Sequence, residues 1–104
     1  MSGAANPLRG EAGLRIEGTL HVLRPSFAAL VAAEAELGPL FALVERAAEG
    51  RLAIGELAIL FWHCLRERPD TLTLETVGEA IVMQGLSAVT PALRVLLGQI
   101  LQGR

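Results

Sequence analysis

Apolar residues occupy alternate positions in two short stretches near the start of the chain. The alternation covers residues 12–16 and resumes after Gly18 over residues 20–23. A period of two is typical of strands that bury one face. The sequence therefore predicts a β-hairpin whose second strand ends at Pro25.

Two turn lengths are compatible with this hairpin, and they place different residues opposite each other. A two-residue loop of Glu17 and Gly18 sets Leu14 opposite His21 and Ile16 opposite Thr19. A three-residue loop, 16–18, sets Leu14 opposite Leu20 and Ala12 opposite Val22. A slip of one residue sends a strand's apolar set to the other face. The register that keeps apolar side chains together is therefore predicted, with Gly18 in the left-handed conformation.

After the hairpin, apolar positions recur at the three- and four-residue spacing of amphipathic helices. Ser26 is a suitable N-cap for a helix that begins at Phe27 and stops at Gly38. Later helices are predicted over 40–49, over 52–67, from a Thr73 cap to about Gly85, and from Ser87 or Pro91 to Gln102.

The expected fold class is α+β, mostly α, with the N-terminal hairpin packed on a bundle of about four to five short helices. The chain has 104 residues, which is the usual size of one domain. Residues 1–8 are expected to form a mobile arm, and residues 9–104 are expected to form the single domain.

A glutamate interrupts the apolar stripe of the first predicted helix. The stripe consists of Phe27, Leu30, Val31 and Leu37, and Glu34 falls in its middle. A buried carboxylate needs a partner. The favoured interpretation is that Glu34 pairs with an arginine or caps the N-terminus of a neighbouring helix, and the alternative is a contact with another protein.

The second half of the chain has more apolar positions than one core needs. The predicted helix over 52–67 is apolar on most sides, which is typical of a central helix or of an interface. In the second predicted helix, Phe41, Leu43, Val44 and Ala48 are available for packing. The residues predicted to contact a partner are Glu34, Ile59, Leu60, Trp62, Leu93, Leu97, Ile100 and Leu101.

Composition and charge weaken several classes of function. The net charge is −2, which gives no long-range attraction to nucleic acid or to acidic membranes, and no apolar run has the length of a membrane span. The helices over 40–49 and 52–67 are separated by a short turn, as in a helix-turn-helix. The front turns of the second helix offer no basic or amide side chain to base edges.

Candidate chemistry is sparse. Cys64 is the single cysteine, which excludes an internal disulfide and fits a reducing, cytoplasmic setting. His63 and Cys64 are adjacent and diverge by about 100° on a helix, so they make a poor pair of zinc ligands with or without His21. No serine has an attendant histidine and acid, and no glycine-rich phosphate loop is present. We therefore expect no catalysis, no metal and no cofactor.

The order of these signals resembles the gene transfer agent tail protein family, small phage-derived proteins grouped with tail assembly chaperones. The likeness runs from Asn6 to Gly103 and includes NPLRGE before the hairpin, LRPSFAAL after it, and GRL after the second predicted helix. Bulky residues over 61–64 and the connector RERPDT depart from the family pattern. The matching residues are Arg9, Gly10, Glu11, Gly18, Leu23, Leu30, Glu34, Gly38, Leu40, Gly50 and Leu52.

The resemblance implies a protein of the tail module that helps a long-tailed, phage-like particle to assemble. We expect a chaperone that covers the amphipathic helices of the tape measure protein before the tail tube polymerises. The alternative is a structural tail or tail tube component retained in the particle, and a small helical DNA-binding regulator is a weaker one. The implied partners are the tape measure protein, the tail tube protein or both.

Self-association through the hairpin edge or the helix stripes is left open. Neither nucleic acid nor a membrane is expected as a partner. The expected location is the cytoplasm of the bacterial cell that produces the particle, or the assembled tail.

Overall fold

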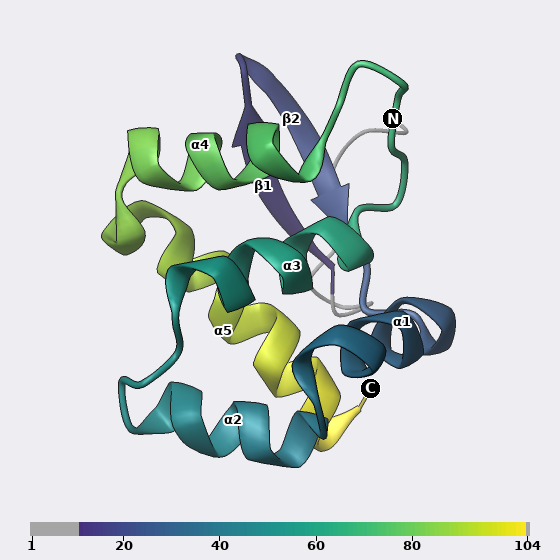
Figure 1. Cartoon of the computed structure of the whole chain (residues 1–104), viewed down its shortest axis with the longest axis vertical. Helices are drawn as coiled ribbons and strands as arrows, with labels where there is room; N and C mark the ends of the chain where they lie inside the picture. Colours follow the sequence, from purple (N-terminus) through teal and green to yellow (C-terminus); the bar gives the residue numbers. More distant parts are fainter. Residues whose placement is uncertain (1–10, 104) are drawn as a thin grey trace.

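The hairpin begins the described part of the chain, and five helices follow it. The structure is a computed structural model that describes residues 11–103, so the predicted arm over 1–8 lies outside the described residues. The elements, shown in Figure 1, are β1 (Ala12–Ile16), β2 (Thr19–Leu23), α1 (Phe27–Leu37), α2 (Leu40–Ala48), α3 (Ile54–Cys64), α4 (Leu74–Gln84) and α5 (Leu86–Gln102). This arrangement confirms the predicted fold class, α+β and mostly α.

The predicted three-residue hairpin loop is wrong. β1 and β2 pair in antiparallel fashion with Leu14 opposite His21 and Ile16 opposite Thr19. The loop is the two-residue Glu17-Gly18, and both residues have positive φ, 51° and 85°. Such a turn matches the right-handed twist of the two strands. This backbone match determines the register.

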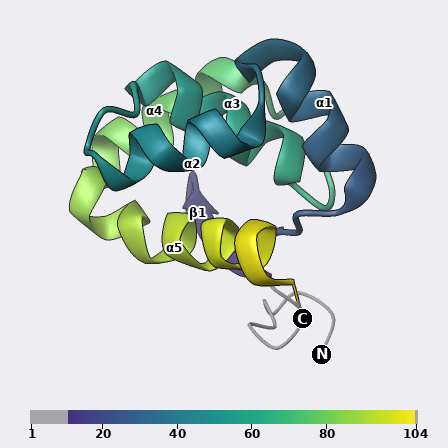
Figure 2. The same ribbon diagram turned by 90° about the horizontal axis from the view of Figure 1, so that it is seen from below.

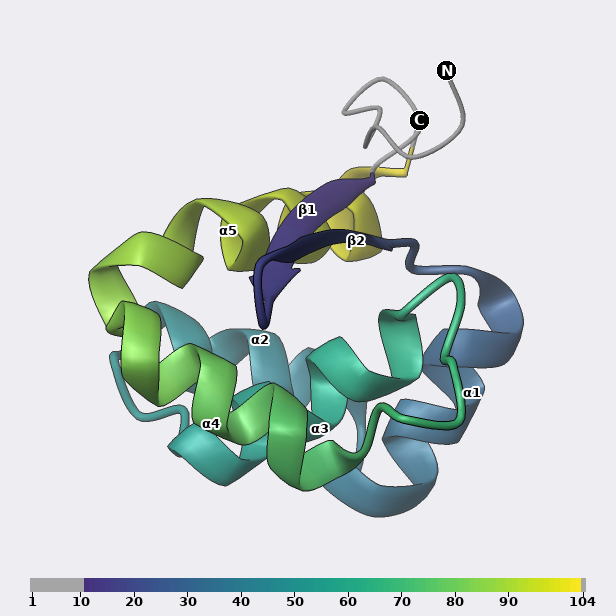
Figure 3. The same ribbon diagram turned by 90° about the horizontal axis from the view of Figure 1, so that it is seen from above.

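The inward face of the hairpin belongs mainly to β1. Ala12, Leu14 and Ile16 are buried, and β1 lies between α5 and α4 (Figures 2 and 3). Leu20 points to the other face and covers Gly13, where a Cβ atom would lie 3.1 Å from a methyl carbon of Leu20. In this register Ala12 and Leu23 are a buried apolar pair, whereas Leu14 and Leu20 lie on opposite faces of the hairpin.

The chain on either side of the hairpin fixes it to the helices. The amide of Arg66 donates to the carbonyl of Val22 at 2.9 Å, and the amide of Arg24 donates to the carbonyl of Cys64 at 2.6 Å. The guanidinium of Arg24 also contacts the buried carboxylate of Glu11, with Nη2 to Oε2 at 2.6 Å. The outer edge of β2 is thus partly covered by residues 64–66.

The predicted helix limits agree with the caps. Ser26 Oγ accepts from the amide of Ala29 at 3.2 Å, and Thr73 Oγ1 accepts from the amide of Thr76 at 3.1 Å. Gly38 ends α1 with φ of 84°. Some limits differ: α3 covers only Ile54–Cys64, α2 ends one residue early at Ala48, and α5 begins at Leu86 and includes Pro91 within its length.

Removing either cap should destabilise the protein measurably. Ser26→Ala and Thr73→Ala should each lower the free energy of unfolding by about 1 kcal/mol, because one helix-terminal amide loses its acceptor. Urea titration followed by circular dichroism measures the change. Ser87→Ala is the control, since Ser87 is exposed and caps no helix. Equal effects of the three substitutions would contradict the capping roles.

The core includes the fully buried side of α3, which packs between α1 and α4. Phe61 and Leu60 of α3 have no exposed surface, and the same is true of Leu23, Leu43, Val77, Ile81 and Leu96. α3 packs on α1 and on α4, while α5 packs on β1 and α4. The third helix therefore has a central position, which is one of the two alternatives that its apolar pattern allowed.

The predicted inward faces of α1 and α2 are wrong in part. The side of α1 that packs inward carries Leu30, Ala33 and Leu37. Phe27 is 85% exposed and Val31 is 49% exposed. In α2, Leu43 is buried, but Phe41 is 81% exposed and Ala48 is also exposed. The small Ala33 is fully buried on the inward side of α1, and the aromatic side chains of both helices are exposed.

Candidate interaction surfaces

Glu34 is a helix cap in this structure. Its Oε2 accepts a hydrogen bond from the amide of Leu40 at 3.0 Å, at the first residue of α2. A carboxylate at a helix N-terminus satisfies a free amide and interacts favourably with the helix dipole. The predicted capping role is confirmed. The side chain is exposed, which explains how it can occupy the stripe of Phe27 and Val31 without being buried.

Around Glu34, large apolar side chains form an exposed surface that we call the aromatic face. Its exposed members are Phe27, Val31 and Phe41, together with Leu101, which is 54% exposed. They surround a groove of about 290 Å³ whose walls include Leu30, Leu40, Val44 and Ile100. Two phenylalanines with more than four fifths of their surface exposed are unusual in a small protein.

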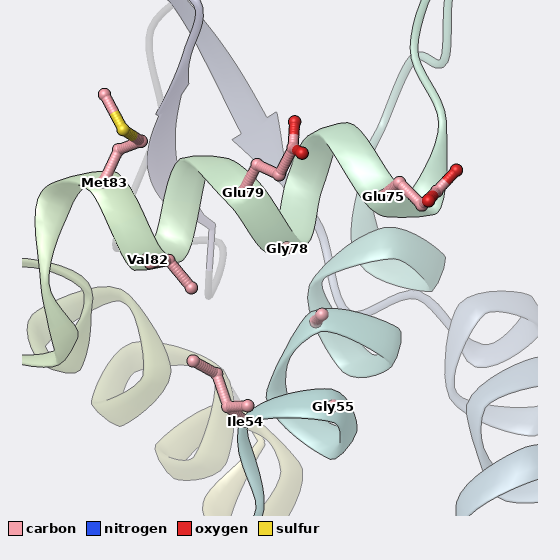
Figure 4. Close-up of a pocket in the computed structure, with 8 residues that line it drawn as sticks. Ile54, Gly55, Glu75, Gly78, Glu79, Val82 and Met83 are labelled. Atoms are coloured by element: carbon pink, nitrogen blue, oxygen red, sulfur yellow. The ribbon is translucent and has the colours of Figure 1, made fainter.

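A second hollow lies between α3 and α4, and we call it the α3–α4 groove. It has a volume of about 620 Å³. Ile54 and Val82 point toward each other across it, while Glu79 and Met83 lie along α4 (Figure 4). The floor is made by small residues, Gly55, Ala58 and Gly78.

The residues predicted to contact a partner are distributed over several places. Glu34, Ile100 and Leu101 come together on the aromatic face. Leu60 has no exposed surface and belongs to the core, because α3 is covered there by its neighbours. The remaining four, Ile59, Trp62, Leu93 and Leu97, are half-buried. A partner role for the accessible members stays a prediction.

Sequence reasoning missed the most exposed members of both surfaces. Phe27 and Phe41 had been placed inside, and Val82 and Met83 had not been singled out. One signal was available for α1. Leu30, Ala33 and Leu37 also have helical spacing, and this stripe contains no charge. The charged stripe was therefore the better candidate for the outside.

Several ionisable side chains of the described residues hold elements together. Arg46 of α2 donates to Glu56 of α3 at 2.6 Å, and Glu56 also accepts from the amide of Ala53 at 3.0 Å. The hydrogen bond from Arg46 and then the one from Ala53 lower the pKa of Glu56. His63 contacts the carboxylate of Glu36. Among residues 11–103, no three His, Cys, Asp or Glu side chains are grouped so that they could hold a metal ion.

Cys64 should be unreactive in the folded protein. It is buried, and loss of hydration raises its pKa to about 12, so the thiol keeps its proton at neutral pH. Iodoacetamide at pH 8 should modify it only in denaturant, as mass measurement will show. Because the unfolded thiol loses its proton at lower pH, the free energy of unfolding should also fall as pH rises above about 9. Rapid labelling of the native protein would contradict this account.

A model of the family described as "Phage tail tube protein, GTA-gp10" matches residues 9–103, nearly the whole chain. The chain belongs to this family. The predicted resemblance to gene transfer agent tail proteins is thereby confirmed, and the protein is a component of a phage-like tail system. No curated protein and no solved structure matches the chain.

Membership gives the two surfaces a context. A tail component associates with other tail proteins or with copies of itself, so exposed apolar surface is expected on it.

No single helix within residues 11–103 has the length and hydropathy to cross a membrane. The helix pairs α1–α2 and α4–α5 reach those values only when joined across bends of 76° and 119°.

Proposed function

We propose that this protein is a structural subunit of the tail, retained in the finished particle, and that it joins its neighbours through the aromatic face. The observation that carries this proposal is the exposure of Phe27 and Phe41 on one surface of a chain that belongs to a tail tube family. Aromatic side chains supply much of the binding energy of protein interfaces when a partner removes them from water.

The position of the two phenylalanines favours a defined contact. Both line the same groove, so one partner element can cover them together. Both helices are held in place by the rest of the fold. Helix α1 packs on α3. Helix α2 is held by the Glu34 cap at its first residue and by the Arg46–Glu56 ion pair with α3. A partner therefore meets a surface that is already ordered, and little conformational entropy is lost on binding.

The second candidate function is the assembly chaperone that covers the tape measure protein before the tube polymerises. The observation that favours it is the groove itself, which is open and apolar and is walled by helices α1, α2 and α5. Such a groove can accept the apolar stripe of an amphipathic helix and release it when tube subunits replace the chaperone.

Two experiments separate the candidates. Mass spectrometry of purified particles should find the protein at a level comparable with other tail subunits if it is structural, and should find none if it is a chaperone. Co-expression with the tape measure protein tests the second candidate. A chaperone should co-purify with that protein and raise its soluble yield, and a retained subunit should not be needed for its solubility.

The same proposal includes three further points. The protein is made in the cytoplasm of the bacterial cell that produces the particle, it acts without a cofactor, and it catalyses no reaction. Within residues 11–103, the Arg24–Glu11 and Arg46–Glu56 ion pairs and the Glu34 cap connect separate parts of the fold, which is a structural use of these charged side chains.

A further inference from the structure

The α3–α4 groove has an apolar interior and one acidic side. Ile54 and Val82 form its walls, and both are exposed, 45% and 65%. Along α4, Glu75, Gly78, Glu79 and Val82 recur at three- and four-residue intervals, so they share one face of the helix. Figure 4 shows Glu75 and Glu79 one turn apart on this helix.

The glycines of the groove floor are not required by the fold of this chain. Gly55 and Gly78 lie within helices and neither has positive φ. A Cβ atom at Gly55 would meet nothing within 4 Å, and one at Gly78 would make an ordinary contact of 3.9 Å with Ala58. Alanine would fit at both positions and would favour the helix more. What the glycines do provide is a bare floor that another backbone can approach closely.

The charges that line the groove all have one sign. Glu75 and Glu79 are its only ionisable lining residues within the described part of the chain, and no hydrogen bond or ion pair holds either carboxylate. On the other side of α4, Arg15 lines a neighbouring hollow together with Glu79. The Arg15 guanidinium donates to the carbonyl of Gly18 at 3.3 Å. An occupant of the groove therefore meets two carboxylates separated by one helical turn.

We propose that the α3–α4 groove binds an amphipathic helix of a different protein, with a narrow apolar ridge flanked by arginine or lysine residues about one turn apart. The ridge lies on the glycine floor between Ile54 and Val82, and the cations face Glu75 and Glu79. The inference that this helix belongs to another tail protein rests on the proposed function. The shape and charge of the groove are independent of the proposed function.

The helices described in this chain do not include such a helix, so a second copy would not supply one from residues 11–103. Lysine is absent from the sequence, and the five helices contain only two arginines, Arg46 and Arg94. Arg46 is already paired with Glu56. Within residues 11–103, none of the five helices thus carries two cations one turn apart, which is why we assign the groove to a different protein.

The test uses the full chain and two designed peptides. One is an alanine-rich helix of about 18 residues with a leucine ridge flanked by arginines, and the other has glutamates in place of the arginines. Fluorescence anisotropy should show binding of the arginine peptide at about 50 mM salt, weakening about threefold or more at about 500 mM. The glutamate peptide should bind at least about tenfold more weakly.

Two variants locate the binding. Gly55→Leu fills the floor of the groove and should lower the affinity for the arginine peptide about tenfold or more. It should not lower the thermal midpoint of unfolding, because the site is open and leucine favours a helix. Gly98→Leu is the matched control, since Gly98 is also helical with no atom within 4 Å of a Cβ but lies outside the groove. The double variant Glu75→Gln, Glu79→Gln should bind the arginine peptide and the glutamate peptide with similar affinity. This variant still tests the proposal if Gly55→Leu fails to fold.

Several outcomes would overturn the proposal. They are absence of binding by the folded chain, equal affinity for both peptides, no effect of Gly55→Leu or of the glutamine pair, and loss of binding in a Phe27→Ser, Phe41→Ser variant. Light scattering that shows self-association lost in Gly55→Leu would assign the groove to a second copy instead. None of these outcomes bears on whether the protein is retained in particles, so the proposed function stands or falls separately.

Discussion

The variant Phe61→Ala should lose about 3 to 5 kcal/mol of its free energy of unfolding, a large part of what a domain of this size possesses. Phe61 has no exposed surface and is among the largest side chains in the core. It lies on α3, which packs on both α1 and α4. Truncation therefore removes apolar contacts and leaves a cavity in the middle of the fold. Urea titration at 25 °C measures the change.

The other two phenylalanines are matched controls for this result. Phe27 and Phe41 are 85% and 81% exposed, so Phe27→Ala and Phe41→Ala should each change the free energy of unfolding by less than about 0.5 kcal/mol. A small effect at Phe61, or a large effect at either of the exposed residues, would contradict the assignment of core and surface.

The double variant Phe27→Ser, Phe41→Ser should fold normally and yet fail to enter tails. Anchoring aromatic residues at an interface are worth about 2 kcal/mol or more each, so incorporation into particles should fall about tenfold or more. The measurement is the amount of variant protein in purified particles relative to the other tail proteins, with a thermal melt of the free variant to show that it is folded.

Leu20→Ser serves as the control for this variant. Leu20 is 45% exposed but lies on the hairpin, away from the aromatic face. Incorporation of this variant should match that of the original chain. If the double variant is incorporated as well as Leu20→Ser, the aromatic face is not the contact surface.

Local signals in the sequence predicted the elements well. The Ser26 and Thr73 caps and the glycine at the end of α1 each depend on a few neighbouring residues, and the structure contains all three features. The capping role of Glu34 was also predictable, since a carboxylate within an apolar stripe six residues before a helix start has few other uses.

The hairpin register depends on the geometry of its turn as well as on the pairing of apolar side chains, and the hydrophobic pattern describes only the pairing. The pattern favoured Leu14 opposite Leu20, but the twist of the Glu17-Gly18 turn places Leu14 opposite His21. The apolar side chains then separate, with Leu14 against the helices and Leu20 over Gly13. The backbone geometry of a two-residue turn decided the outcome.

The interaction surfaces were the least predictable part. Periodicity treats every apolar residue on a helix as a core candidate, and the choice between the two stripes of α1 depends on how closely α3 approaches it. In the folded chain the stripe with Ala33 is buried and Phe27 is exposed. The α3–α4 groove combines residues of two helices that are separated by a connecting segment, and it exists only once both helices are in place.

Quantitative mass spectrometry of purified particles tests the central claim most directly. The protein from intact, nuclease-treated and density-purified particles is compared with the other tail proteins of the same sample, and a mutant that makes no particles serves as the blank. A retained tail subunit predicts a fixed ratio to those proteins across independent preparations. Absence of the chain from particles, with its presence in the lysate of producing cells, would contradict a structural role.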